Sequence, residues 1–249
     1  MKKLLFIALL SLPLVGMAQV TDLFNKGKEL YKAESYEQAI EAWKTVIDKG
    51  QHSASLYYNI GNAYYKLNQV APSIYYYEKA LQLNPDDSEV LNNIAFARNM
   101  RVDIIEPLPK TVFAKWYQKI AGITDYDGWA LGSVIFMILL VVAFTGYYFS
   151  GASLKKRFFF VGGLVMIALM LGSVAMAYST YNDEQAKRFG IIFEEAIDVK
   201  SEPTPSGEFA FELHEGTKVS IVDQDQDWLL IRLIDGKEGW VPSEVLREL

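Results

Sequence analysis

The chain lacks cysteine altogether and has only two histidines in 249 residues. Without cysteine it can form no disulfide, no thiolate metal site and no lipid-modified N-terminal cysteine. His52 and His214 both fall in predicted loops or turns, so we expect solvated side chains rather than catalysts. The acidic run at 223–227 lacks the glycine and distal glutamate of an EF-hand loop, and no phosphate-binding glycine loop occurs. These absences predict a chain with no catalytic residues, no metal and no cofactor.

The net charge and the first residues bear on where the protein works. The formal net charge of −6 argues against the broad basic face that nucleic-acid binding requires. Residues 1–18, MKKLLFIALLSLPLVGMA, combine two lysines, a short apolar stretch and small residues before Gln19. That pattern predicts a secretory signal peptide. An uncleaved anchor is the alternative, and in both cases the chain that follows would be exported.

Two long apolar runs occupy the middle of the chain. Residues 129–149 contain no charged side chain over 21 residues, and residues 158–182 contain none over 25. A helix of the first length spans roughly 31 Å, about the thickness of a bilayer core. We therefore predict transmembrane helices over 128–149 and 158–182, packed as an antiparallel hairpin in the lipid bilayer. The absence of charged residues within them argues against an ion or proton pathway.

The connection between these runs, residues 150–157, sets the predicted orientation. It carries Lys155, Lys156 and Arg157 and no acid. The opposite flanks of the two runs instead carry acids: Asp125, Asp127, Asp183 and Glu184. Short loops rich in lysine and arginine stay in the cytoplasm. The loop is therefore predicted to be cytoplasmic, and the segments on both sides of the hairpin periplasmic, at a bacterial inner membrane.

Residues 21–100 contain an internal repeat with an offset of 34 residues. The aligned pairs are Asn25 with Asn59, Gly27 with Gly61, Tyr31 with Tyr65, Ala39 with Ser73, and Trp43 with Tyr77. This period, with a small residue where two helices cross and an aromatic residue four positions later, resembles the tetratricopeptide repeat (TPR). A partial third copy begins at Ser88. The resemblance implies an α-solenoid over 19–101, made of two repeats and a closing helix. Pro72 departs from the family pattern, and because its missing N–H costs little in a first helical turn, we expect it at a helix start.

The resemblance also implies a binding surface, because the first helix of each tetratricopeptide repeat lines the concave face. The candidate partner-binding residues on that face are Asn25, Lys28, Tyr31, Tyr58, Asn59, Asn62, Tyr65, Lys66 and Asn93, with Phe96 beside them on the closing helix. Asparagine amides can pair with an extended peptide backbone, and tyrosines add contact area. For Trp43, Tyr57, Tyr64 and Tyr77 we expect core packing instead. Glu89 stands where some arrays carry a base for a C-terminal carboxylate, so no such clamp is predicted.

Residues 102–127 are predicted to be a linker. Pro107 and Pro109 favour extended backbone before them. Residues 111–123 then place apolar side chains near one helical face, with Lys115 and Lys119 beside it. We expect a short helix lying on the membrane surface. A helix packed against the repeats is the alternative.

Residues 191–249, after a linker at 183–190, read as short strands and turns and predict a small all-β barrel. The pattern resembles a bacterial SH3-like domain, and the residues that carry the resemblance are Val199, Pro203, Leu213, Gly216, Val219, Trp228, Gly236, Gly239, Trp240 and Val241. Trp228 and Trp240 are candidates for either core or ligand surface, and we favour the core for Trp240. The resemblance to wall-degrading relatives implies peptidoglycan binding. Lys200 stands where the family often has an arginine, and this departure argues against that role here.

The order of these parts resembles one family, the BatE-type proteins of the Bat aerotolerance operon in Bacteroidetes. The resemblance implies a multidomain membrane protein that works beside membrane-anchored von Willebrand factor A proteins and a MoxR-type ATPase in oxidative-stress tolerance. The leading hypothesis is a non-enzymatic scaffold that binds partner proteins through the array and the barrel. The alternative is a cell-envelope anchor whose barrel binds peptidoglycan. A transporter subunit is a third reading that the charge-free helices disfavour.

Overall fold

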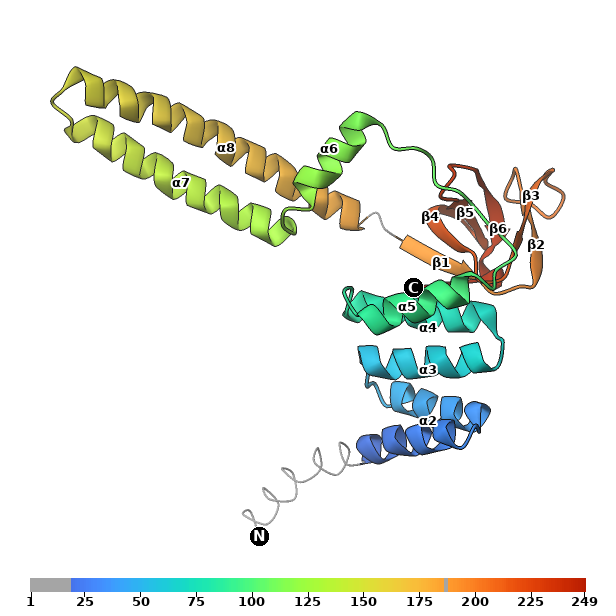
Figure 1. Cartoon of the computed structure of the whole chain (residues 1–249). Coiled ribbons are helices and arrows are strands. Elements are labelled where there is room, and N and C mark those ends of the chain that lie inside the picture. Colours follow the sequence, from blue (N-terminus) through green and yellow to red (C-terminus); the bar gives the residue numbers. More distant parts are fainter. Residues whose placement is uncertain (1–18, 186–187) are drawn as a thin grey trace, which may run out of the picture. The chain divides into compact units, whose positions relative to one another are not determined.

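The structure is a computed structural model that describes residues 19–185 and 188–249. The predicted signal peptide, residues 1–18, lies outside the described residues. The chain forms two compact units. One unit joins the residues up to Pro107 with Arg188–Leu249, and the other comprises the segment between them, from Leu108 onward. Figure 1 shows the helical array, the apolar hairpin and the β-sheet in chain order.

The array consists of stacked antiparallel helices. Residues 19–32 are helical and pair with α2 (Tyr36–Asp48), α3 (Ala54–Lys66) pairs with α4 (Val70–Leu83), and α5 (Ser88–Arg98) closes the array. The turn inside each pair contains a residue with positive φ, Glu34 at 59° and Asn68 at 57°, which again lie 34 residues apart. Ser53 and Asp87 cap α3 and α5 by accepting backbone N–H groups. The period in the sequence is therefore repeated in the turn geometry.

The helix crossings place a glycine against a large aromatic ring in each repeat. Trp43 and Tyr77 are fully buried, and they lie against the backbones of Gly27 and Gly61. Tyr57 and Tyr64 are also buried, as expected for core residues. Pro72 is the third residue of α4, in the first turn, where its missing N–H breaks no helical hydrogen bond.

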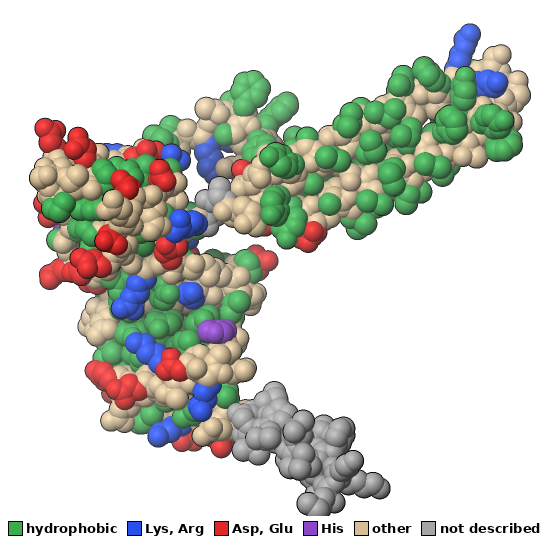
Figure 2. Space-filling view, turned by 180° about the vertical axis from the view of Figure 1, so that it is seen from behind, with side chains coloured by type: hydrophobic (Ala, Val, Ile, Leu, Met, Phe, Trp, Pro, Cys, Tyr) green, Lys and Arg blue, Asp and Glu red, His purple; other side chains and the backbone are tan. Residues whose placement is uncertain are grey.

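The second unit contains α6 (Val112–Ala121), α7 (Tyr126–Phe149) and α8 (Ser153–Gln185). The last two are long and apolar enough to cross a membrane, and almost none of their residues are buried. Figure 2 shows hydrophobic side chains over the visible surface of this hairpin. Helix α8 begins at Ser153, inside the predicted loop, so Lys155, Lys156 and Arg157 lie in its first turns. Lysine and arginine are good helix formers, so the helix extends through them.

Helix α6 belongs to the same unit as the hairpin, and none of its residues is buried. Its apolar side chains are exposed, with Phe113 84% and Trp116 69% accessible. The Tyr117 hydroxyl bonds to Ser179 and Asp183 near the end of α8, which fixes one side of α6 to the hairpin. The membrane-surface position of α6 stays a prediction.

The C-terminal domain is one antiparallel seven-stranded sheet in the order β3-β2-β6-β5-β4-β1-β7. The strands are β1 (Arg188–Ile192), β2 (Ala196–Lys200), β3 (Phe209–His214), β4 (Lys218–Asp225), β5 (Trp228–Arg232), β6 (Glu238–Pro242) and β7 (Leu246–Glu248). It begins at Arg188, before the predicted start at 191. The preceding linker is correspondingly shorter, since α8 reaches Gln185.

The two barrel tryptophans lie on the outer side of their strands. Along β5 and β6 the buried residues alternate with half-buried ones, and Trp228 and Trp240 are among the half-buried. Leu229 and Val241 point into the core instead. The favoured core position for Trp240 was therefore wrong, because the strand alternation gives the inward position to Gly239. A Cβ on Gly239 would lie 2.4 Å from Val199 Cγ1, so glycine allows the strands to approach closely there.

Candidate functional site

A pocket of about 330 Å³ lies on the concave side of the array. Three helices supply its lining: residues 19–32, α3 and α5. The lining residues are Tyr31, Tyr58, Asn62, Tyr65, Lys66, Asn93 and Phe96. We call this set the groove pocket. Most of the candidate partner-binding residues are thus gathered in one place.

Three of the candidates lie outside the groove pocket. Asn25 is exposed and Asn59 is half-buried. Lys28 is also exposed, and its ammonium nitrogen lies 5.8 Å from the centre of the Phe24 ring. They remain predicted parts of a longer concave face, but the pocket does not include them.

A hydrogen-bond network fixes the floor of the groove pocket. The Tyr77 hydroxyl donates to Asn62 Oδ1 at 2.6 Å, and Asn93 Nδ2 donates to the same oxygen at 2.9 Å. Asn93 Nδ2 also donates to the Tyr58 hydroxyl at 3.0 Å. Both lone pairs of Asn62 Oδ1 and both hydrogens of Asn93 Nδ2 are thereby used. Asn62 Nδ2 can therefore still donate to a ligand, and Asn93 Oδ1 can still accept from one.

The other polar groups of the pocket are tyrosine hydroxyls and one cation. Burial raises the pKa of Tyr31, and burial likewise raises the pKa of Tyr77, so both hydroxyls stay protonated at neutral pH. Lys66 is exposed at the end of α3, and within the described residues it makes no ion pair. No carboxylate is among the residues that line the pocket. The groove pocket is thus aromatic, donor-rich and weakly basic.

A second polar site lies where the segment after α5 meets the barrel. Asp103 Oδ2 accepts the His214 backbone N–H at 2.8 Å and the Thr217 hydroxyl at 2.7 Å, and Asp103 Oδ1 lies 2.9 Å from His214 Nδ1. The hydrogen bond to Asp103 raises the pKa of His214. Burial alone would raise the pKa of Asp103, but its hydrogen bonds outweigh burial and lower it. The prediction of a solvated His214 was therefore wrong, because its partner lies 111 residues earlier in the chain.

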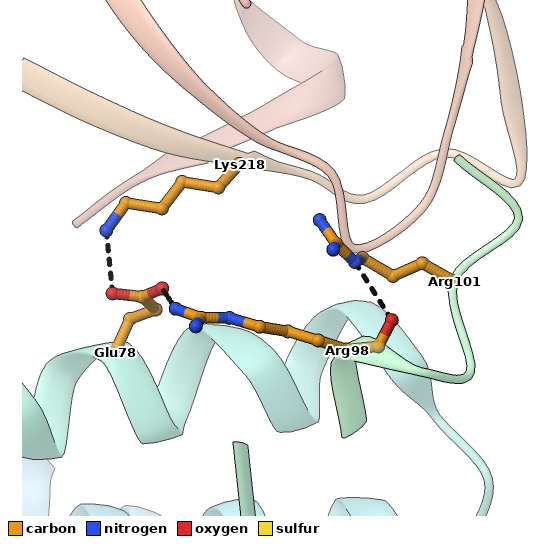
Figure 3. Close-up of polar contacts among 4 residues, drawn as sticks. All are labelled: Glu78, Arg98, Arg101 and Lys218. Atoms are coloured by element: carbon orange, nitrogen blue, oxygen red, sulfur yellow. Dashed lines mark hydrogen bonds and ion pairs between the residues drawn. The ribbon is translucent and has the colours of Figure 1, made fainter. Parts of the chain in front are cut away.

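A buried carboxylate joins the array to the barrel nearby (Figure 3). Glu78 of α4 is only 6% exposed, and its two oxygens bind two cations from different elements. Arg98 of α5 and Lys218 of β4 each lie 2.7 Å from one oxygen. Neither this site nor the Asp103 site was predicted. Their partners lie 20 to 140 residues apart, and nothing in the local pattern marks them.

Family models match both the helical array and the C-terminal β-domain. Two tetratricopeptide-repeat models match residues 27–68 and 54–87, and a bacterial SH3 domain model matches residues 195–247. The chain therefore contains TPR repeats and a C-terminal bacterial SH3 domain, separated by two long apolar helices. Both matched families are binding domains, and no catalytic domain is among the matches.

The other comparisons add little. No curated protein matches the sequence. Among solved structures, the NMR structure of the second TPR domain of the human RPAP3 protein in complex with an HSP70 peptide is similar at 24% identity. That match covers 34% of this chain and 71% of the other, with a TM-score of 0.33.

Proposed function

We propose that this protein is a non-enzymatic membrane scaffold whose groove pocket holds an extended segment of a partner protein. The observation that carries the proposal is the pair of half-used amides in the pocket. Asn62 keeps its donor end free and Asn93 keeps its acceptor end free. An extended peptide offers one C=O and one N–H per residue, so the two amides can pair with its backbone without regard to its sequence.

The remaining lining supplies the apolar part of the binding energy. Tyrosine rings give contact area at low cost in conformational entropy, because only two side-chain torsions must be fixed. Phe96 is 53% exposed at the edge of the pocket, where a partner side chain would cover it. Lys66 adds a charge that favours an acidic residue in the segment.

The scaffold is proposed to sit in the inner membrane with both soluble parts on the periplasmic side. The contact between Glu78 and Lys218 supports a common side for the two parts, because the residues before and after the hairpin belong to one compact unit. The hairpin would then cross the membrane twice and return the chain to its starting side. The basic residues at the turn of the hairpin support a cytoplasmic position for that turn.

The cellular role and the partner protein are proposed from the resemblance to BatE-type proteins. The order of TPR repeats, two apolar helices and a bacterial SH3 domain supports it. The partner would then be a membrane-anchored protein with a von Willebrand factor A domain, and the assembly would serve aerotolerance. The segment bound in the groove would belong to such a protein.

The test is a pull-down of the tagged full-length protein from its own membranes in mild detergent, with partners identified by mass spectrometry. The informative variant is Phe96→Ala combined with Lys66→Ala, because both side chains are exposed and neither belongs to the hydrogen-bond network. The matched control is Leu83→Ala on α4, a residue 54% exposed outside the pocket.

Stoichiometric recovery of one membrane protein, reduced at least about tenfold by the double variant and unchanged by the control, is the expected result. A tenfold loss corresponds to about 1.4 kcal/mol, a modest share of what a buried aromatic contact contributes. Equal recovery with the double variant would refute the groove as the binding site. Recovery with wall fragments alone would favour the peptidoglycan anchor instead.

A further inference from the structure

Helix α5 begins a third repeat that the chain does not complete. Its inner residues Val90, Ile94 and Ala97 are buried in the array core. In a full repeat, a second helix would follow and cover the next face. Here residues 102–106 run on without helix or strand. A solenoid needs a terminal element that covers its last apolar surface, so something else must cover this end of the array.

The barrel covers this end. Ile191 of β1 is completely buried, and the core cluster that contains it is otherwise formed by array residues such as Ile74 and Ile94. Phe193, just after β1, packs edge-on against Tyr75 of α4 with ring centres 5.7 Å apart. The apolar core of the array is thus completed by residues more than a hundred positions later in the chain.

The turn between β3 and β4 fits closely onto the start of α4. Gly216 has φ +80°, and a Cβ there would lie 3.0 Å from both Val70 and Ile74. Glu215 accepts the free backbone N–H of Ala71 at 3.4 Å. Gln69, the N-cap residue of α4, makes no side-chain capping bond. A barrel carboxylate therefore takes the place of the missing cap, where a negative charge also suits the helix dipole.

Glu78 connects this contact to the groove. A buried carboxylate needs compensation on both oxygens, and Arg98 of α5 and Lys218 of the barrel each supply one cation. Arg98 lies on the same short helix as Asn93 and Phe96 of the groove pocket. Arg101, in the segment after α5, donates from Nε to the backbone oxygen of Arg98 (Figure 3). Lys218 of the barrel is thus linked to Arg98 of α5 through the carboxylate of Glu78.

We propose that the SH3 domain acts as the C-terminal cap of the TPR array, and that Glu78 and Lys218 are positioning residues for α5 and so for the groove pocket. The cap itself follows from the contacts alone. Its consequence for ligand binding rests on the function proposed above. The SH3 domain is then part of the binding unit and not a separate module tethered to it.

The test compares amide hydrogen exchange in the full-length protein in detergent for the wild type and for Lys218→Glu, which sets a second carboxylate against Glu78. Exchange of the α5 amides reports its local opening and needs no ligand. The expected result is at least about tenfold faster exchange in α5, with the helix over 19–32 and α2 unchanged. The matched control is Arg232→Glu, which breaks an exposed ion pair with Glu238 elsewhere on the barrel and should leave α5 unchanged.

Lys218→Met provides a milder variant, since it removes the charge but keeps an apolar chain beside Phe189. It should accelerate α5 exchange less than Lys218→Glu but more than the Arg232 control. Unchanged α5 exchange in both Lys218 variants would overturn the cap. Hydrogen exchange needs no partner, so the cap and the groove assignment can fail separately. The exchange experiment tests the cap, and the pull-down with the Phe96 and Lys66 double variant tests the groove.

Discussion

The crossing of α3 and α4 should tolerate even one added carbon poorly, and Gly61→Ala tests this. A Cβ at Gly61 would lie 2.7 Å from Cδ1 and 2.8 Å from Cε1 of the Tyr77 ring. That ring is fully buried, and its hydroxyl is held by Asn62. The ring therefore cannot withdraw without moving the floor of the groove pocket.

The expected change in the free energy of unfolding combines one stabilising and two destabilising contributions. Alanine is favoured over glycine inside a helix by about 1 kcal/mol. Overpacking a close-packed core costs about 1–3 kcal/mol, and losing the bond between Tyr77 and Asn62 costs about 1 kcal/mol more. Steric cost outweighs propensity, so the free energy of unfolding of the array should fall by about 1–3 kcal/mol.

The assay is urea unfolding of the full-length protein in mild detergent, followed by pulse proteolysis of the array. A Tyr77→Leu background supplies the control, because a smaller side chain leaves room for the added methyl group. In that background Gly61→Ala should cost at least about 1 kcal/mol less than in the wild type. An equal cost in both backgrounds, or a stabilised single variant, would refute the steric account.

Two further predictions concern the joint with the barrel and the membrane topology. The hydrogen bond to Asp103 raises the pKa of His214 above the ordinary 6.5. The charged imidazole therefore stabilises the folded protein fully below pH 6.5, and this stabilisation is lost as the pH rises through the raised pKa. Glu212 and Glu195 also favour the charged imidazole, and Asp103 stays ionised between about pH 5 and about pH 9 because its pKa lies below the ordinary 3.8. In urea titrations over this pH range, a His214→Gln variant should not lose stability as the pH rises. With no native cysteine, a Ser153→Cys reporter at the hairpin turn should stay unlabelled by an impermeant maleimide in intact spheroplasts, whereas exposed Glu202→Cys on the barrel should be labelled. The reverse pattern would invert the orientation.

The sequence predicted best those features that repeat or are local. The offset of 34 residues identified the helix pairs, the buried aromatics and most of the groove pocket, because each repeat folds the same short pattern. Uncharged runs likewise predicted the two apolar helices. Their ends were predicted less well, since Lys155 to Arg157 suit both a loop and a first helical turn.

Contacts between distant segments could not be predicted. Glu78 looks like an ordinary helix residue, and only the fold brings Lys218 to it over 140 positions. The same holds for the contact between Asp103, in the predicted linker, and His214, in a predicted solvated turn. Trp240 was misplaced for a different reason: a one-residue shift in strand alternation exchanges the inner and outer faces, and Gly239 takes the inner one.

The contact between the array and the barrel also constrains the proposed membrane hairpin. The chain leaves the compact unit of array and barrel at Pro107 and re-enters it at Arg188, and Ile191 is then buried within the array core. A segment inserted between two such points must begin and end on the same side of a membrane, so its number of crossings must be even. Two crossing helices meet that requirement. A single crossing helix would place Glu78 and Lys218 on opposite sides of the membrane. For a hairpin that spans the membrane as proposed, this packing requires an even number of crossings, and the basic residues at its turn support the proposed orientation.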